Sequence, residues 1–183
     1  MGKYRTIVAD PPWDHSDGTG TAFIDGRWEQ RGGVPYNCMG LDAIEALDVR
    51  GLAADDAHLY MWTTNRFLEA SYRIARTWGF EPVKPIVWGK PPIGPFLGGA
   101  WGGSSVEFCL FCRRGNLKHT GRAGRQWFGW PRGAHSAKPE AFLDIVEQVS
   151  PGPYVELFAR RARFGWDYWG NESLGTATMG EAA

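Results

Sequence analysis

Short apolar runs alternate along the chain with stretches that carry apolar residues at helical spacing. Five runs predict strands, at residues 7–9, 58–62, 83–88, 106–112 and 154–159. Three stretches predict helices, at residues 41–47, 66–78 and 139–150. Strands that alternate with helices are typical of α/β folds. The pattern therefore predicts a mostly parallel, doubly wound sheet.

Two glycine-rich segments interrupt this alternation. Residues 14–34 contain five glycines, which is typical of a lid, a binding loop or a disordered segment. Residues 89–105 contain six glycines and three prolines and predict a second, mobile loop. We expect residues 1–172 to form one domain and residues 173–183 to form a flexible C-terminal tail.

The first predicted strand stops at Asp10-Pro11-Pro12-Trp13. Two prolines fix the backbone in a stiff extended conformation, and open α/β folds bind ligands where such strands end. This corner suits methyl transfer to an exocyclic amine of a base. Asp10 and the Pro11 carbonyl could accept its N–H groups, and Trp13 could stack on a flipped base. The alternative is a plain turn in which Asp10 caps its own backbone and Trp13 fills the core.

Composition gives no global attraction to nucleic acid, because 20 basic residues balance 20 acidic ones. Residues 108–139, however, contain no Asp or Glu and carry seven positive charges interleaved with aromatic residues. Such a segment is suited to tracking a backbone and stacking bases. We expect it to bind nucleic acid through Arg113, Arg114, Lys118, Arg122 and Arg125. A solvated basic loop with its aromatic side chains in the core is the alternative.

Three cysteines are too few for a disulfide scaffold. Cys109 and Cys112 lie three residues apart on a predicted strand, which places them on opposite faces, and no second Cys/His pair follows at zinc spacing. We therefore predict core cysteines and no metal site. Without a secretory signal or a transmembrane run, the expected location is the cytoplasm of a bacterial or phage-infected cell.

Several motifs occur in an order that resembles the DPPW-type N6-adenine methyltransferases. These β-class amino-methyltransferases include the catalytic subunit of the eukaryotic mRNA N6-adenosine methyltransferase and bacterial and phage DNA-modifying relatives. The resemblance spans residues 4–172. Besides the Asp10 corner, it rests on residues 35–39, 59–62, 78–80, 107–115, 135–140, 150–152, 156–160 and 169–171.

The resemblance implies a single Rossmann-like class I methyltransferase domain with permuted motif order, in which the catalytic corner precedes the strand that begins the S-adenosylmethionine site. It implies catalytic roles for Asp10, Pro11, Pro12 and Trp13. It also implies that Tyr36 lies over the target base. The cofactor would be bound by Asp10, Lys138, Glu156, Phe158, Arg160 and Asn171.

The expected activity is methyl transfer from S-adenosylmethionine to adenine N6 by direct in-line displacement on a flipped base. DNA is favoured over RNA because the chain is small and carries no added RNA-binding domain. Two alternatives stay open: a non-catalytic nucleic-acid-binding partner of the same fold, and a methyltransferase for cytosine N4 or RNA. The protein could act as a homodimer or a heterodimer, and no membrane association is expected.

Overall fold

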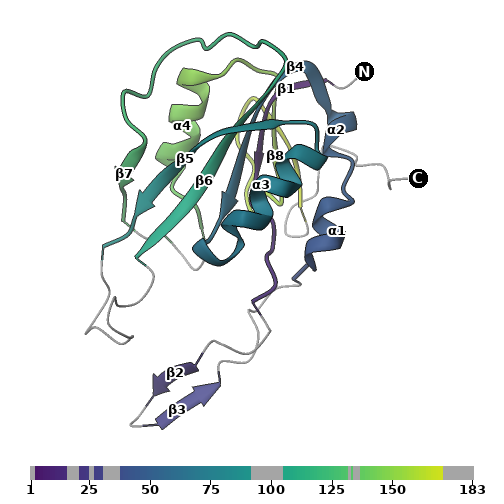
Figure 1. Cartoon of the computed structure of the whole chain (residues 1–183). Helices are drawn as coiled ribbons and strands as arrows, with labels where there is room; N and C mark the ends of the chain where they lie inside the picture. Colours follow the sequence, from purple (N-terminus) through teal and green to yellow (C-terminus); the bar gives the residue numbers. More distant parts are fainter. Residues whose placement is uncertain are drawn as a thin grey trace.

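The fold is that of a computed structural model, which describes residues 3–15, 21–24, 27–30, 38–91, 105–131, 133 and 137–170. Tyr36, Asn171, the expected tail at 173–183 and most of the second predicted loop lie outside these residues. A mixed sheet of seven strands forms the centre of the molecule (Figure 1). Its order is β7-β5-β6-β4-β1-β8-β9.

The strands of this sheet come from the whole length of the chain. They are β1 (Tyr4–Ala9), β4 (Ala53–Thr63), β5 (Glu81–Gly89), β6 (Val106–Arg114), β7 (Trp127–Gly129), β8 (Tyr154–Leu157) and β9 (Trp166–Trp169). The helices are α1 (Leu41–Glu45), α2 (Val49–Leu52), α3 (Leu68–Thr77) and α4 (Glu140–Val149), with a short 3-10 turn at Asn65–Phe67 before α3. The predicted α/β fold with a mostly parallel sheet is confirmed.

Strand β1 lies in the middle and pairs in parallel with β4 on one side and β8 on the other. Val8 is in register with Tyr60 of β4 and with Glu156 of β8. A strand buried on both faces is expected to be uniformly apolar, and Ile7, Val8 and Ala9 are almost fully buried. The residue that follows, Asp10, is therefore placed between the carboxyl ends of two neighbouring strands.

Strand β6 is antiparallel to both of its neighbours, β4 and β5. Its beginning therefore lies at the same edge of the sheet as the ends of β1, β4 and β8. Glu107, near the start of β6, is in register with Trp88 near the end of β5. The end of β6 lies at the opposite edge, where Arg113 faces His58 and Arg114 faces Ala57.

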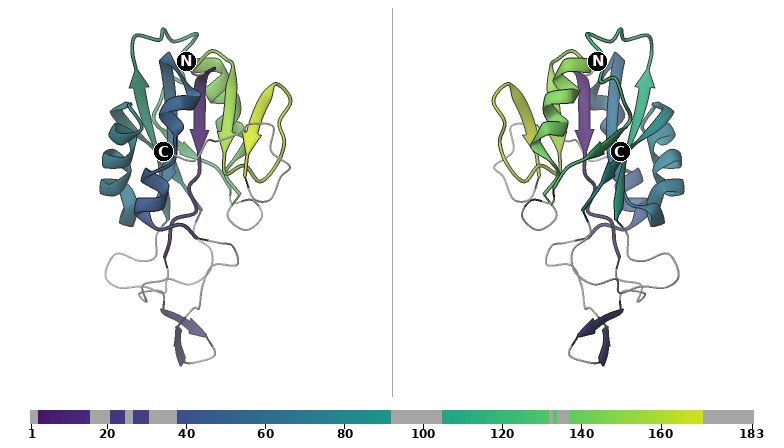
Figure 2. Two further views of the ribbon diagram at one scale, coloured as in Figure 1. Left: turned by 90° about the vertical axis from the view of Figure 1, so that its right-hand side faces the viewer. Right: turned by 90° about the vertical axis from the view of Figure 1, so that its left-hand side faces the viewer.

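Helices cover both faces of the sheet (Figure 2). On one face, α3 and α1 bury Ile74, Trp78 and Ile44 against Leu59 and Met61 of β4. On the other face, α4 packs Phe142, Leu143 and Val146 with the aromatic side chains of Tyr60, Trp62 and Trp88. The alternation of β4 side chains between the two cores follows from the two-residue period of a strand. None of the described helices is long and apolar enough to cross a membrane.

Several elements differ from the sequence prediction. Residues 14–34, expected to be a loop, contain an antiparallel hairpin of β2 (Thr21–Ile24) and β3 (Arg27–Gln30), which projects beyond the carboxyl end of β1 (Figure 1). Helix α2 and the short strands β7 and β9 were not predicted. Strand β5 has a register shift against β6 between Pro82 and Lys84. Cys109 and Cys112 are buried in opposite cores, as predicted.

A buried polar network joins the middle of β4 to the end of α4. The Ser150 hydroxyl lies 2.7 Å from His58 Nδ1 and 2.7 Å from the Tyr60 hydroxyl. His58 and Ser150 are fully buried. Burial, together with the charges of the nearby His119 and Arg113, lowers the pKa of His58 to about 4, so this ring is neutral near neutral pH.

Substitution Ser150→Ala tests this network. It removes the Ser150 hydroxyl, which is the shared hydrogen-bond partner of His58 and Tyr60 in this network. A buried polar group that is left without a partner costs about 1–3 kcal/mol. We expect the free energy of unfolding, measured by urea titration, to fall by about 2 kcal/mol. The matched change at exposed Ser105 should leave it within about 0.5 kcal/mol. Equal effects of the two substitutions would contradict a structural role for the network.

Candidate active site

Backbone hydrogen bonds hold the Asp10-Pro11-Pro12-Trp13 corner in place at the end of β1. The Asp10 N–H donates to the Leu157 carbonyl of β8 at 3.3 Å, and the Trp13 N–H donates to the Pro11 carbonyl at 2.8 Å. The Pro12 carbonyl accepts from the Met39 N–H at 2.9 Å. Because a carbonyl oxygen has two lone pairs, the Pro11 oxygen still has capacity for one further donor. The corner is therefore rigid before any ligand binds.

Trp13 lies differently from the expectation that it stacks on a base. Its ring is 4% exposed and stacks on Phe67, with ring centroids 5.3 Å apart. The indole N–H donates to the Trp62 carbonyl at 3.0 Å. This is the core-filling alternative: the side chain ties the corner to the end of β4. Trp13 is also among the residues that line the larger of the cavities described below, and its stacking on a base stays a prediction.

A row of alternating charges runs across the carboxyl ends of the strands. Lys138, which precedes α4, donates to Asp10 at 2.8 Å and lies 3.5 Å from Glu107 Oε2. Glu107 in turn accepts from Lys90, at the end of β5. The ammonium groups of Lys138 and Lys90 also lie over the rings of Trp62 and Trp88, respectively. The Asp10 carboxylate is therefore the first member of a four-residue ionic network.

Within this network, ion pairing outweighs the effect of burial on the pKa of Lys138 and on the pKa of Glu107. Burial lowers the pKa of Lys138, but the carboxylates of Asp10 and Glu107 outweigh it, so the pKa is raised overall. For Glu107, burial raises the pKa, but the two neighbouring lysines outweigh it, so the pKa is lowered. Each lysine therefore compensates the desolvation of a carboxylate.

Glu107 is the site residue that the sequence analysis missed. It lies in residues 107–115, one of the segments that carry the family resemblance, and near the start of a predicted strand. In a parallel sheet, the start of this strand would lie at the edge opposite to Asp10. The antiparallel direction of β6 brings it to Lys138 instead.

Two cavities open at this edge and share Asp10, Lys138 and Arg160. The larger, of about 210 Å³, is lined by the corner, Thr63, Thr64 and Glu107, with His15 at its margin. The smaller, of about 30 Å³, is lined by Glu156, Phe158 and Arg161 in addition to Ala137 and the shared residues. The structure thus brings together five predicted site residues that lie far apart in the sequence: Asp10, Lys138, Glu156, Phe158 and Arg160.

The turn after β8 shapes the smaller cavity. Phe158 adopts a left-handed backbone conformation, with a φ of 64°, and its ring packs edge-on against Trp169 of β9. Gly170 lies so close to this turn that a Cβ atom would stand 2.5 Å from the Ala159 carbonyl oxygen. Burial, followed by the charge of Asp10, raises the pKa of Glu156 to about 7. A carboxyl group that titrates near neutral pH is often found at a functional site.

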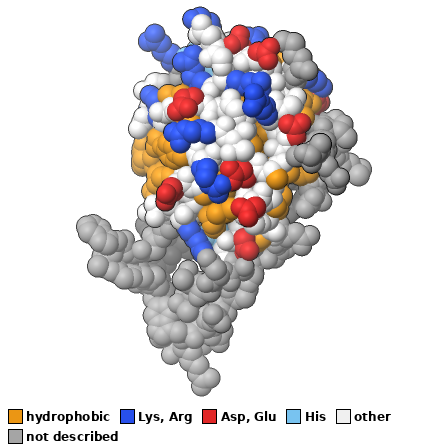
Figure 3. All heavy atoms as spheres, turned by 45° about the vertical axis from the view of Figure 1, so that its right-hand side comes forward, with side chains coloured by type: hydrophobic (Ala, Val, Ile, Leu, Met, Phe, Trp, Pro, Cys, Tyr) orange, Lys and Arg blue, Asp and Glu red, His pale blue; other side chains and the backbone are white. Residues whose placement is uncertain are grey.

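The predicted nucleic-acid-binding residues do not gather at this edge. Arg113, Arg114 and Lys118 lie at the opposite end of β6, where Arg114 donates to the Arg50 carbonyl at 2.9 Å. Arg122 and Arg125 line a separate cavity that shares no described lining residue with the one at Asp10. On the face shown in Figure 3, basic and acidic side chains are interspersed. Tyr36 and Asn171 lie outside the described residues.

Comparison with known proteins shows the family to which the chain belongs. The sequence profile of the MT-A70 family matches residues 4–172. The type II methyltransferase M.MunI of Mycoplasma sp is 33% identical over 184 residues, which cover 93% of this chain and 78% of that protein. The MT-A70-like N(6)-adenosine-methyltransferase of Drosophila melanogaster is 30% identical over 168 residues, and the match covers 87% of this chain and 25% of that protein.

A more distant relative is the human N(6)-adenosine-methyltransferase catalytic subunit METTL3. It is 27% identical, and the match covers 94% of this chain and 28% of that protein. The chain thus spans about a quarter of the length of these two animal relatives. The family match extends over nearly the whole chain and includes every described residue of the two cavities. The chain therefore belongs to the MT-A70 family, a family of S-adenosylmethionine-dependent N6-adenine methyltransferases.

Proposed function

We propose that this protein binds S-adenosylmethionine and transfers its methyl group to the N6 amine of adenine in DNA. The observation that carries the proposal is the position of Asp10. Its carboxylate lies between two cavities, bonded to Lys138, at the place where β1, β4 and β8 end together. One cavity would hold the target base and the other would receive part of the cofactor.

The side chains of the smaller cavity fit the charges of S-adenosylmethionine. Lys138 is a cation suited to the cofactor's carboxylate, and Asp10 and Glu156 are acceptors suited to its ammonium and hydroxyl groups. Phe158 and Arg160 would form the walls beside its ribose and adenine. The cofactor supplies an electrophilic methyl carbon on a positively charged sulfur. Two carboxylates beside that sulfur would favour its binding.

The larger cavity would orient the amine. An adenine amine is a weak nucleophile because its lone pair is delocalised into the ring. Asp10 and the free lone pair of the Pro11 carbonyl would accept its two hydrogens and aim the nitrogen at the methyl carbon. As the N–C bond forms, the S–C bond breaks with its electrons going to sulfur, and the amine then loses a proton to water. Glu107 would support this geometry by holding Lys138 beside Asp10.

Pro12 and Trp13 would act by shaping the corner. Trp13 fixes its direction through Phe67 and the Trp62 carbonyl. A base flipped out of its strand would then enter a cavity whose walls are already in place.

One of the comparisons supports DNA rather than RNA as the substrate. M.MunI, the relative matched over most of its own length, is named a type II methyltransferase. The relatives named adenosine methyltransferases are matched over about a quarter of theirs. A methyltransferase that acts on an adenine in DNA would flip that base out of its strand.

Substitution Asp10→Asn tests the role of the corner. The amide keeps the size of the side chain but loses the charge and one acceptor, so the rate of methyl transfer should fall by about a hundredfold to a thousandfold. The rate is measured by mass spectrometry of nucleosides from DNA and RNA oligomers incubated with labelled cofactor. N6-methyladenine should form in the DNA oligomer.

Asp42→Asn is the matched control, because Asp42 is an exposed acidic residue in the first turn of α1. It should leave the rate unchanged. An Asp10→Asn variant that is folded and turns over at the rate of the control would refute the assignment. Label found only in RNA would refute the choice of DNA.

The pKa of Glu156 predicts a pH dependence for cofactor binding. A cationic ligand favours the ionised carboxylate, which forms as the pH rises through about 7. The affinity for S-adenosylmethionine, measured by titration calorimetry, should therefore increase from pH 6 to pH 8. In Glu156→Gln, which cannot ionise, this increase should disappear. A wild-type affinity that is flat over this range would show that Glu156 does not contact the cofactor.

A further inference from the structure

A third cavity lies away from Asp10, on the α4 face of the sheet. Its volume is about 560 Å³, within the range of roughly 300–1,000 Å³ that is typical of small-molecule sites. Its lining residues come from β4, β5, β6 and α4, and from residues 119–128. We call it the α4 cavity.

Aromatic and aliphatic side chains form the inside of the α4 cavity. Tyr60, Phe111 and Ile86 come from the strands, and Phe142 and Val146 come from α4. Phe128 of β7 closes one side. Phe128 is half-buried and is one of the residues that line the cavity. Its ring stacks on that of Trp130, with ring centroids 4.5 Å apart and an angle of 4° between the two planes. A flat ring that entered here would continue an existing aromatic stack.

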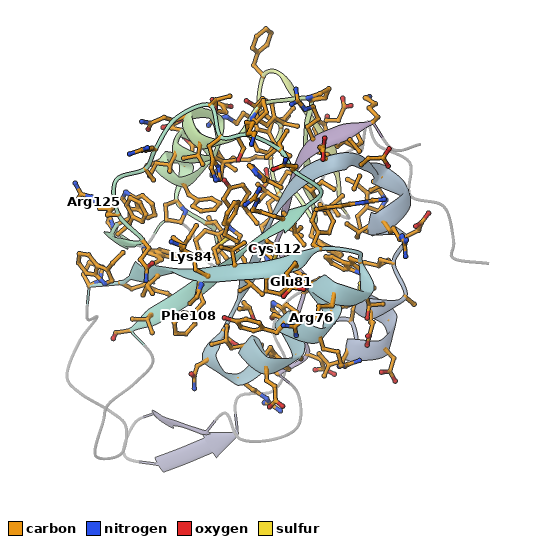
Figure 4. All side chains as sticks on the ribbon, turned by 45° about the horizontal axis from the view of Figure 1, so that its top comes forward. Arg76, Glu81, Lys84, Phe108, Cys112 and Arg125 are labelled. Carbon is orange, nitrogen blue, oxygen red and sulfur yellow. The ribbon has the colours of Figure 1, made fainter. Side chains whose placement is uncertain are left out.

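The charged groups around this cavity are all of one sign. No Asp or Glu is found among its described lining residues. Four Lys and Arg side chains line it: Lys84, Arg113, Arg122 and Arg125. Arg122 and Arg125 are exposed, and Lys84 on β5 faces the same side as Arg125 (Figure 4). Arg113 is more buried, and its Nε makes no hydrogen bond within the described structure. An apolar cavity with unneutralised cations is complementary to a ring that carries an anionic group.

We propose that the α4 cavity binds a nucleotide unit of a single-stranded nucleic-acid segment, with its base beside Phe128 and its phosphate at Arg122 and Arg125. This inference rests on the proposed action on nucleic acid, and it adds a second point of attachment distinct from the methylated base. Stacking on an aromatic ring depends little on base identity, and phosphate contacts carry no sequence information. The site would therefore hold the strand without selecting its sequence.

The test uses full-length protein and a short, fluorescently labelled oligothymidylate, with affinity measured by fluorescence anisotropy. Thymine has no exocyclic amine, so this probe separates the α4 cavity from the site at Asp10. We expect the probe to bind and to be displaced by excess thymidine monophosphate but not by thymidine. Asp10→Asn should bind it as the wild type does, so that a failure of methyl transfer and a failure of this proposal are told apart.

Two variants probe the two halves of the ligand. The double substitution Arg122→Ala with Arg125→Ala should weaken binding by about tenfold or more, and should lower the slope of log affinity against log salt by about two. Phe128→Leu keeps the apolar volume but removes the aromatic face, and should weaken binding with the salt slope unchanged. The matched control is Arg5→Ala with Arg50→Ala, which removes two exposed arginines that do not line the cavity.

The proposal is overturned if the oligomer does not bind, or if the control pair weakens it as much as the Arg122 and Arg125 pair does. It is also overturned if Phe128→Leu leaves the affinity unchanged in a folded protein. Thymidine monophosphate that binds as tightly as the oligomer would exclude a strand as the ligand. Loss of a dimer in these variants, with oligomer binding intact, would show that a second copy of the chain covers the cavity.

Discussion

The ion pair between Asp10 and Lys138 joins residues 128 positions apart in the sequence, and the candidate site depends on it. Both side chains are less than one-fifth exposed, so each carries a desolvation cost that only a well-placed partner can offset. Glu107 gives Lys138 a second partner, and Lys90 gives Glu107 one in return. Removing one member of such a pair leaves a buried charge uncompensated, which typically costs about 3–5 kcal/mol. The same groups that could bind a charged cofactor therefore also fix the positions of the elements that carry them.

The sheet topology explains how this contact arises. Parallel pairing of β1 with β4 and β8 brings three carboxyl ends together, and the reversed direction of β6 adds Glu107. Strand β8 follows β1 by more than a hundred residues in the chain yet lies beside it. This order agrees with the permuted arrangement implied by the resemblance. The Asp10-Pro11-Pro12-Trp13 corner and the other predicted cofactor residues of the two cavities therefore come from distant parts of the sequence and meet at one edge.

Sequence patterns predicted the buried strands and the two long helices because their apolar runs are long enough to show a period. They failed for β7 and β9, which have three and four residues and whose pairing is set by the neighbouring strands rather than by their own composition. The direction of a strand leaves no mark in its residues. Glu107 was therefore missed, and Arg114 was grouped with Arg122 although it donates to the Arg50 carbonyl and does not line the α4 cavity. The stacking of Trp13 on Phe67 was not predicted, because the two residues are distant in the sequence.

A double-mutant cycle on cofactor binding tests the central claim most directly. Titration calorimetry with S-adenosylmethionine would compare the wild type with Asp10→Asn, Lys138→Met and the double variant. If the two side chains form one site, the losses should be non-additive, with a coupling energy of about 0.5–3 kcal/mol. Wild-type affinity in all three variants, or losses that add without coupling, would contradict the account.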